Sequence, residues 1–100
     1  MSAFANKTLL ALVSSTLDQA SLAIVKGDFF SGALCFRSIE ALSNLASPTD
    51  HAAAIEAAAQ WFVSLETNLG QDAIDFADDM LQKTSSLFQA EVISRNAELI

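Results

Sequence analysis

The side chains best suited to catalysis in this 100-residue chain are its one histidine, His51, and its one cysteine, Cys35. Nucleophilic catalysis needs a nucleophile, a base within hydrogen-bonding reach and a group that orients the base. Cys35 stands between Leu34 and Phe36, so we expect a small core or interface residue. His51 follows Asp50 in the first turn of an expected helix, where we expect the imidazole to be exposed. No catalytic pair is evident, and we predict that the protein is not an enzyme.

Four aspartates fall within eight residues: Asp72, Asp75, Asp78 and Asp79. Their spacing places Asp72, Asp75 and Asp79 on one helical face, with Asp78 at its border. A straight helix presents these carboxylates in a row, whereas Ca²⁺ takes about six to eight oxygens arranged around a point. One cysteine and one histidine also exclude the usual zinc sites. We therefore predict no metal and no cofactor, and we weigh a solvated helix start against an acidic docking surface.

The charge of the chain is strongly negative and unevenly placed. Twelve acidic residues face five basic ones, for a net charge of −7. Between Arg37 and Lys83 there are eight acids and no base, while the rest of the chain sums to +1. Nucleic acids and anionic membranes need cationic surface, so direct binding to either is disfavoured. A protein partner with a basic surface is favoured.

The composition indicates one helical domain over residues 1–100. The chain holds 18 alanines and 13 leucines but only three glycines and one proline, which is typical of helices and too few turn residues for a β-rich domain. No apolar run approaches the roughly 18 residues of a membrane span, and the run Leu9 to Val13 after Lys7 is short for a signal peptide. The single cysteine agrees with a reducing cytoplasm.

Hydrophobic periodicity predicts helices over residues 4–25, 28–46, 48–69 and from 72 onward. Gly27 and Gly70 are suited to helix ends, Asp28 to a helix start, and Ser47-Pro48 to a cap followed by a first turn. Such short breaks force successive helices to lie antiparallel. We expect an all-α antiparallel bundle built from two αα-hairpins, with four helices, or five if Thr84-Ser85-Ser86 splits the last one.

The periodic positions also predict the core and the surfaces that stay apolar. Gly32, inside the second helix, is expected where another helix backbone comes close. Phe29, Phe30 and Trp61 are candidate partner contacts, and Trp61 could equally flank the core. The broad apolar surface of the second helix and the Leu99-Ile100 end predict a homodimer or an obligate complex. The expected core comprises Leu10, Val13, Leu17, Ile24, Phe30, Leu34, Ile55, Phe62, Leu65, Ile74, Ala77 and Leu81.

Residues 16–44 resemble a tetratricopeptide-like helical hairpin. The resemblance is carried by Lys26-Gly27-Asp28-Phe29 at the turn, followed by Gly32, Phe36 and Ile39. In that family a glycine, an acid and an aromatic residue close the turn, and the later residues pack one helix on the other. The resemblance implies a scaffold that binds peptides or proteins without catalysis.

The function predicted from the sequence is a non-enzymatic protein-interaction module: a small adaptor, chaperone or inhibitor that occupies a partner's surface. Asp72, Asp75, Asp78 and Asp79, with the aromatic candidates, are its predicted contacts. One alternative is an acidic mimic of nucleic acid that blocks a basic DNA- or RNA-binding site. Another is a small enzyme or metal-binding protein that uses His51 and the aspartates.

Overall fold

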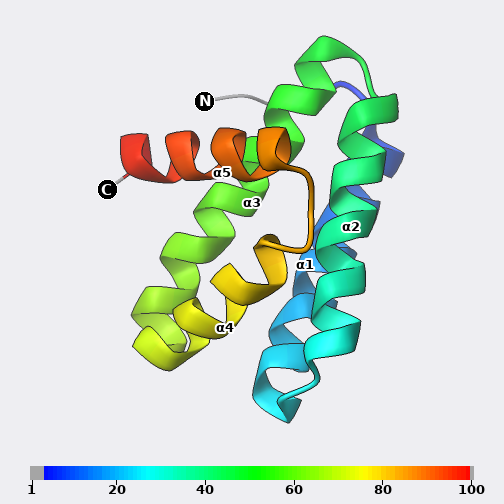
Figure 1. Ribbon diagram of the computed structural model, residues 1–100. Helices are drawn as coiled ribbons and strands as arrows, with labels where there is room; N and C mark the ends of the chain where they lie inside the picture. Colours follow the sequence, from blue (N-terminus) through cyan, green and yellow to red (C-terminus); the bar gives the residue numbers. More distant parts are fainter. Residues whose placement is uncertain (1–3, 100) are drawn as a thin grey trace.

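A computed structural model describes residues 4–99, which form five helices and no strand within that range. The helices are α1 (Lys7–Lys26), α2 (Phe29–Leu45), α3 (Pro48–Leu69), α4 (Gln71–Leu81) and α5 (Ser86–Leu99) (Figure 1). The predicted all-α fold is confirmed. A break between Leu81 and Ser86 separates the last two helices, so the five-helix form of the prediction is the correct one.

The helix ends follow from local residues. Asn6 caps α1 through its side-chain oxygen, so this helix begins later than the expected residue 4. Gly27 ends α1 with a left-handed φ of 69°, a conformation that glycine adopts without a Cβ penalty. Asp28 and Ser47 cap α2 and α3 by accepting hydrogen bonds from backbone N–H groups, as expected. Gly70, with φ of 84°, ends α3 and begins α4 in one residue.

The five helices pack around α3. In Figure 1, α1 and α2 lie side by side and pass in opposite directions, while α5 lies across α3. α4 and α5 both pack on α3, and α5 does so more extensively although α4 is nearer in sequence. The pairing of the helices into two antiparallel hairpins stays a prediction.

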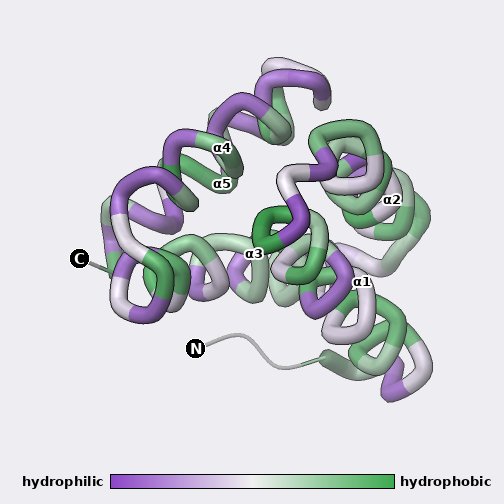
Figure 2. Tube along the Cα trace, turned by 90° about the horizontal axis from the view of Figure 1, so that it is seen from below, coloured by the Kyte–Doolittle hydropathy of each residue, from purple (hydrophilic) through white to green (hydrophobic). Residues whose placement is uncertain are grey.

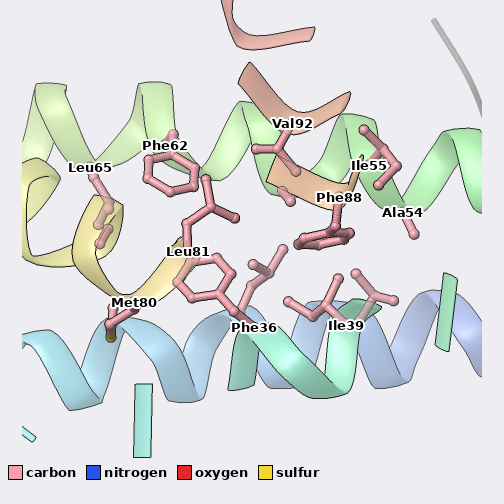
Figure 3. Close-up of a cluster of buried hydrophobic side chains, with 14 of the residues drawn as sticks. Phe36, Ile39, Ala54, Ile55, Phe62, Leu65, Met80, Leu81, Phe88 and Val92 are labelled. Atoms are coloured by element: carbon pink, nitrogen blue, oxygen red, sulfur yellow. The ribbon is translucent and has the colours of Figure 1, made fainter. Parts of the chain in front are cut away.

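Side chains from all five helices form one apolar core. Figure 3 shows Phe36 and Ile39 of α2 lying opposite Phe62 of α3, with Leu81 and Phe88 between the layers. The ring of Phe36 stacks on Phe62 with 5.8 Å between centroids. The predicted core residues that are buried are Val13, Leu17, Ile55, Phe62, Leu65, Ala77 and Leu81.

Three predicted core positions are wrong: Leu10, Phe30 and Leu34 are exposed. Phe30 keeps 73% of its surface accessible. Ile24 and Ile74 are half-buried at the edge of the core. Apolar residues surround most of α2, so its periodicity could not show which face turns inward. The inward face of α2 consists of Gly32, Cys35, Phe36, Ile39 and Ser43.

The close neighbour of Gly32 is a side chain and not the helix backbone that we expected. A Cβ atom at Gly32 would collide with Sδ of Met80 and lie 3.0 Å from its Cε atom. Met80 comes from α4 and is fully buried. The missing side chain at Gly32 therefore makes room for the methionine that joins α4 to α2.

α1 has the length and hydropathy of a membrane span. The core helix of a soluble protein and a signal sequence near the N-terminus pass the same test. α1 contributes Leu9, Val13 and Leu17 to the core, yet only 28% of its most apolar window is buried. Figure 2 shows hydrophobic positions along α1 and α2, whereas hydrophilic positions gather on the side of α4 and α5. The side formed by α1 and α2 is thus more hydrophobic than the side formed by α4 and α5.

Candidate interaction surface

α4 has an acidic side, because this helix turns its apolar residues inward. Ala73, Ala77 and Met80 are buried against the rest of the fold. The intervening positions therefore face solvent. The exposed acids of α4 are Asp72, Asp75, Asp78 and Asp79.

Two of these four aspartates line separate hollows, and Asp75 and Asp79 line neither. Asp78 lies on the rim of a groove between α4 and α5. Asp72 lines a separate hollow between α1 and α4, beside Val25 and Leu69. Asp75 accepts a hydrogen bond of 3.0 Å from the side-chain amide of Gln71. The four carboxylates therefore do not act as one row.

No basic side chain neutralises the acids of α4 within the described chain. Lys83 follows Asp79 by four residues, but its ammonium lies over the Phe29 ring, 5.6 Å from the centroid. The ion pairs among residues 4–99 join other helices or lie within α5. Partial burial raises the pKa of the Asp78 carboxyl, and the charges of Asp75 and Asp79 raise it further. The charges of Asp75, Asp78 and Asp79 thus disfavour one another, and no ion pair within residues 4–99 compensates them.

The groove beside Asp78 was not predicted. We call it the α4–α5 groove; it has a volume of about 520 Å³. Its floor is formed by Phe62, Leu81 and Val92, and Glu66 of α3 supplies a second carboxylate opposite the open side. The break at Thr84-Ser85-Ser86 was the only sequence signal for it, because the angle between the two helices depends on distant contacts.

The three aromatic candidates lie in different surroundings. The indole N–H of Trp61 donates a 2.9 Å hydrogen bond to Oγ of Ser21, and its ring packs edge-on against Phe36. Trp61 thus flanks the core. Phe29 is half-buried in an edge-on contact with Phe76. Among these candidates, only Phe30 is largely open to solvent.

His51 is half-buried, so the expectation of an exposed imidazole is wrong. Its Nδ1 lies 2.9 Å from the carbonyl oxygen of Ser43, and its Nε2 lies 2.7 Å from Oε2 of Glu91. The hydrogen bond with Ser43 contributes most to raising the histidine pKa, and Glu91 adds to it. These contacts join α3 to α2 and α5. They are structural contacts that sequence spacing could not reveal, since Glu91 is 40 residues away.

His51 and the aspartates of α4 are not brought together. Eighteen residues of α3 lie between His51 and Gly70, which sets the two roughly 28 Å apart along the helix axis. Among the residues of the described range, no group of three histidine, cysteine or acidic side chains is placed to hold a metal ion. Cys35 is buried as expected, and its burial raises the pKa of the thiol.

The buried Asp50 has a role beyond the helix start at which it stands. Its Oδ1 accepts a 2.6 Å hydrogen bond from the backbone N–H of Ala5. The N–H of Asn6 lies 3.4 Å from the same oxygen. Asp50 therefore fixes the segment that leads into α1 against the start of α3.

Comparisons with protein-family models, with curated proteins and with solved structures find no match to this chain.

Proposed function

We propose that the protein is a non-enzymatic protein-interaction module, a small adaptor, chaperone or inhibitor that occupies the surface of a basic partner. The observation that carries this proposal is the acidic side of α4, where exposed carboxylates lie beside apolar hollows without a cation from the described chain. Charged groups of one sign steer a partner of the opposite sign. The likeness of residues 16–44 to a tetratricopeptide-like hairpin and a cytoplasmic location belong to the same proposal.

The outer face of α2 supports the second element of the proposal, a homodimer. Phe30, Leu34 and Leu45 are exposed along this helix, and the last keeps 88% of its surface accessible. Residues 1–45 carry three acids and three bases, so the net charge of −7 lies in residues 46–100. Pairing through α2 and its antiparallel neighbour α1 would hold the acidic halves of two copies apart. Leu99 is also exposed, while Ile100 lies outside the described residues.

The acidic surface is tested by replacing Asp75, Asp78 and Asp79 together with asparagine. Removing their mutual repulsion should leave the helicity unchanged and the melting temperature equal or slightly higher. Stopped-flow measurement with a partner recovered from the native host should show slower association at low salt. Association at the wild-type rate would contradict the proposal and leave these acids as solvated groups.

The salt dependence of the affinity for the partner distinguishes the interaction module from a second candidate function, an acidic mimic of nucleic acid. The uncompensated carboxylates of α4 favour this second candidate as well. A mimic that relies on charge alone loses affinity steeply as ionic strength screens its surface. A contact made mainly by apolar side chains, such as Phe30, keeps most of its affinity. Titrations of the recovered partner between low and high salt separate the two.

A further inference from the structure

The α4–α5 groove exists because two helices that follow one another in sequence barely touch. Both α4 and α5 pack on α3, whereas their contact with each other is minimal. Glu66 of α3 is therefore exposed between them, and the buried side chain of Phe62 also lines the groove. Ile74 of α4 and Ile93 of α5 line opposite walls, and Ile93 keeps 60% of its surface accessible.

The walls are held in place by α2, which belongs to neither wall. Nε of Arg37 donates a 3.3 Å hydrogen bond to the carbonyl oxygen of Lys83. The backbone N–H of Ser85 donates a 3.1 Å hydrogen bond to Oε2 of Glu40. Both contacts fix the connection between α4 and α5. The groove is consequently preformed, which lowers the cost of ordering on binding.

The lining has the chemistry of a site for a cationic, partly apolar group. Buried Phe62, Leu81 and Val92 provide an apolar floor, and the two ionisable groups of the lining are the carboxylates of Glu66 and Asp78. No lysine or arginine lines the groove. The lining also holds four amides, of which those of Gln71, Gln89 and Asn96 already donate to Asp75, Thr84 and Ala59. Their carbonyl oxygens can still accept a hydrogen bond from an occupant.

We propose that the α4–α5 groove receives an amphipathic helix of the partner protein, with apolar side chains on the floor and lysine or arginine side chains at Glu66 and Asp78. This inference rests on the proposed function and names the surface that performs it. An apolar stripe flanked by cations is the pattern that a basic amphipathic helix presents. A nucleic acid is opposed by the same carboxylates. A second copy is opposed at this groove, because residues 46–100, which form it, carry the whole net charge of −7.

The electrostatic surroundings of Asp78 fit a bound helix that places a lysine or arginine beside it. Desolvation and the neighbouring charges of Asp75 and Asp79 raise the pKa of its carboxyl. A lysine or arginine placed beside it favours the charged form and removes part of the repulsion. Binding should therefore lower the pKa of Asp78, which an NMR titration of its side-chain carbon can follow.

The probe for the test is a fluorescein-labelled 18-residue peptide of leucine and lysine in helical spacing, compared with a leucine–glutamate peptide of the same pattern. Fluorescence anisotropy with the full chain should show saturable binding of the lysine peptide alone. The double variant Glu66→Gln/Asp78→Asn should weaken binding at least tenfold. Its matched control, Asp18→Asn/Glu98→Gln, removes two exposed charges outside the groove and outside α4, and should change affinity less than twofold.

A second pair of variants tests the apolar wall. Ile93→Ser removes an exposed wall residue and should weaken binding at least fivefold, whereas Leu87→Ser, at an exposed position of the same helix outside the groove lining, should not. Both positions are on the surface, so circular dichroism should stay at the wild-type level. Two results would overturn the groove as the binding site. One is an equal loss of peptide affinity in the groove double variant and in its control double variant, and the other is an unchanged affinity in Ile93→Ser.

The recovered native partner separates failure of the groove from failure of the proposed function. If Asp75→Asn/Asp78→Asn/Asp79→Asn slows its association while Ile93→Ser has no effect, the acidic surface stands and the groove proposal is wrong. If neither variant affects association, both proposals are wrong. If association is impaired in both the aspartate triple variant and Ile93→Ser, while Leu87→Ser associates like the wild type, the groove proposal is supported.

Discussion

His51 has an acceptor at each ring nitrogen, the carbonyl oxygen of Ser43 and the carboxylate of Glu91. A neutral imidazole carries one N–H and can donate to one of these acceptors, whereas the imidazolium donates to both. The folded state therefore favours the charged form, in line with the raised pKa of His51. The packing of α5 on α3 therefore depends on pH through the protonation of His51.

The stability that His51 contributes should decrease as the pH rises. Because folding raises the pKa of His51, its contribution is complete below the unfolded value of about 6.5 and is lost as the pH passes the folded value. Urea unfolding of the wild type and of His51→Gln should differ by up to about 1 kcal/mol at pH 6, since the pair is only half-buried. The difference should shrink at pH 9.

The matched control for this prediction is Glu91→Gln, which keeps the shape of the side chain and removes its charge. It should lower the pKa of His51, measured by NMR, and reduce the pH dependence. A difference between wild type and His51→Gln that is constant from pH 6 to pH 9 would show that the ring acts by packing alone.

Sequence reasoning succeeded for residues whose partners are local and failed for those whose partners are distant. The caps at Asp28 and Ser47 bond to N–H groups three residues away. Asp50 was expected at the first turn of its helix, but its bond to Ala5 spans 45 residues. Local chemistry can be inferred from spacing, whereas such bonds depend on how the helices pack.

At the scale of the helices, the contact of Gly32 with Met80 sets how closely α2 and α4 pack. We expect Gly32→Ala to destabilise the fold by about 1 kcal/mol. The gain in helix propensity is about 1 kcal/mol, while forcing a buried side chain aside costs about 1–3 kcal/mol. The colliding atoms belong to the outer part of the flexible Met80 side chain, but Met80 is fully buried, so any shift displaces its neighbours. Urea unfolding measures the change.

A double-mutant cycle with Met80→Ala tests whether the clash with Met80 causes the destabilisation by Gly32→Ala. The methionine substitution alone is destabilising because it leaves a cavity. Combined with Gly32→Ala, it should cost less than the sum of the two single changes, since the new methyl group then meets no sulfur. Additive effects, or a more stable Gly32→Ala variant, would show that α2 and α4 separate easily at this point.

Helix boundaries could be predicted better than helix faces. Gly27, Gly70 and Ser47 mark breaks through backbone chemistry that does not depend on the rest of the fold. The exposure of Phe30 and Leu34 could not be inferred, because α2 is apolar nearly all round and only packing selects its inward face. The α4–α5 groove depends in the same way on contacts from α2.

At the scale of the whole molecule, we expect two chains per particle. The exposed residues Phe30, Leu34 and Leu45 lie in the half of the chain that carries no net charge. Burying such a surface is favourable at about 25 cal/mol per Å² of apolar area. Light scattering after size exclusion should give twice the mass of 10.6 kDa at high concentration.

The variant Leu34→Lys should give a monomer of unchanged helicity. Leu87→Lys is the control, because Leu87 is also an exposed leucine but belongs to α5 and not to α2. A clean wild-type monomer that binds no hydrophobic dye would contradict the homodimer. If both variants dissociated into monomers, the dimer contact would lie elsewhere than on the outer face of α2.

The long-range polar bonds imply an order in which the molecule assembles. The bonds from Asp50 to Ala5, from Glu40 to Ser85 and from His51 to Glu91 span 40 to 45 residues. Each closes a long loop, and its entropic cost is met only after the intervening helices have condensed. We therefore expect such bonds to form after the folding transition state, with φ-values near zero at Asp50 and Glu40. The groove walls therefore become fixed last, and in partial unfolding they are the first to be released.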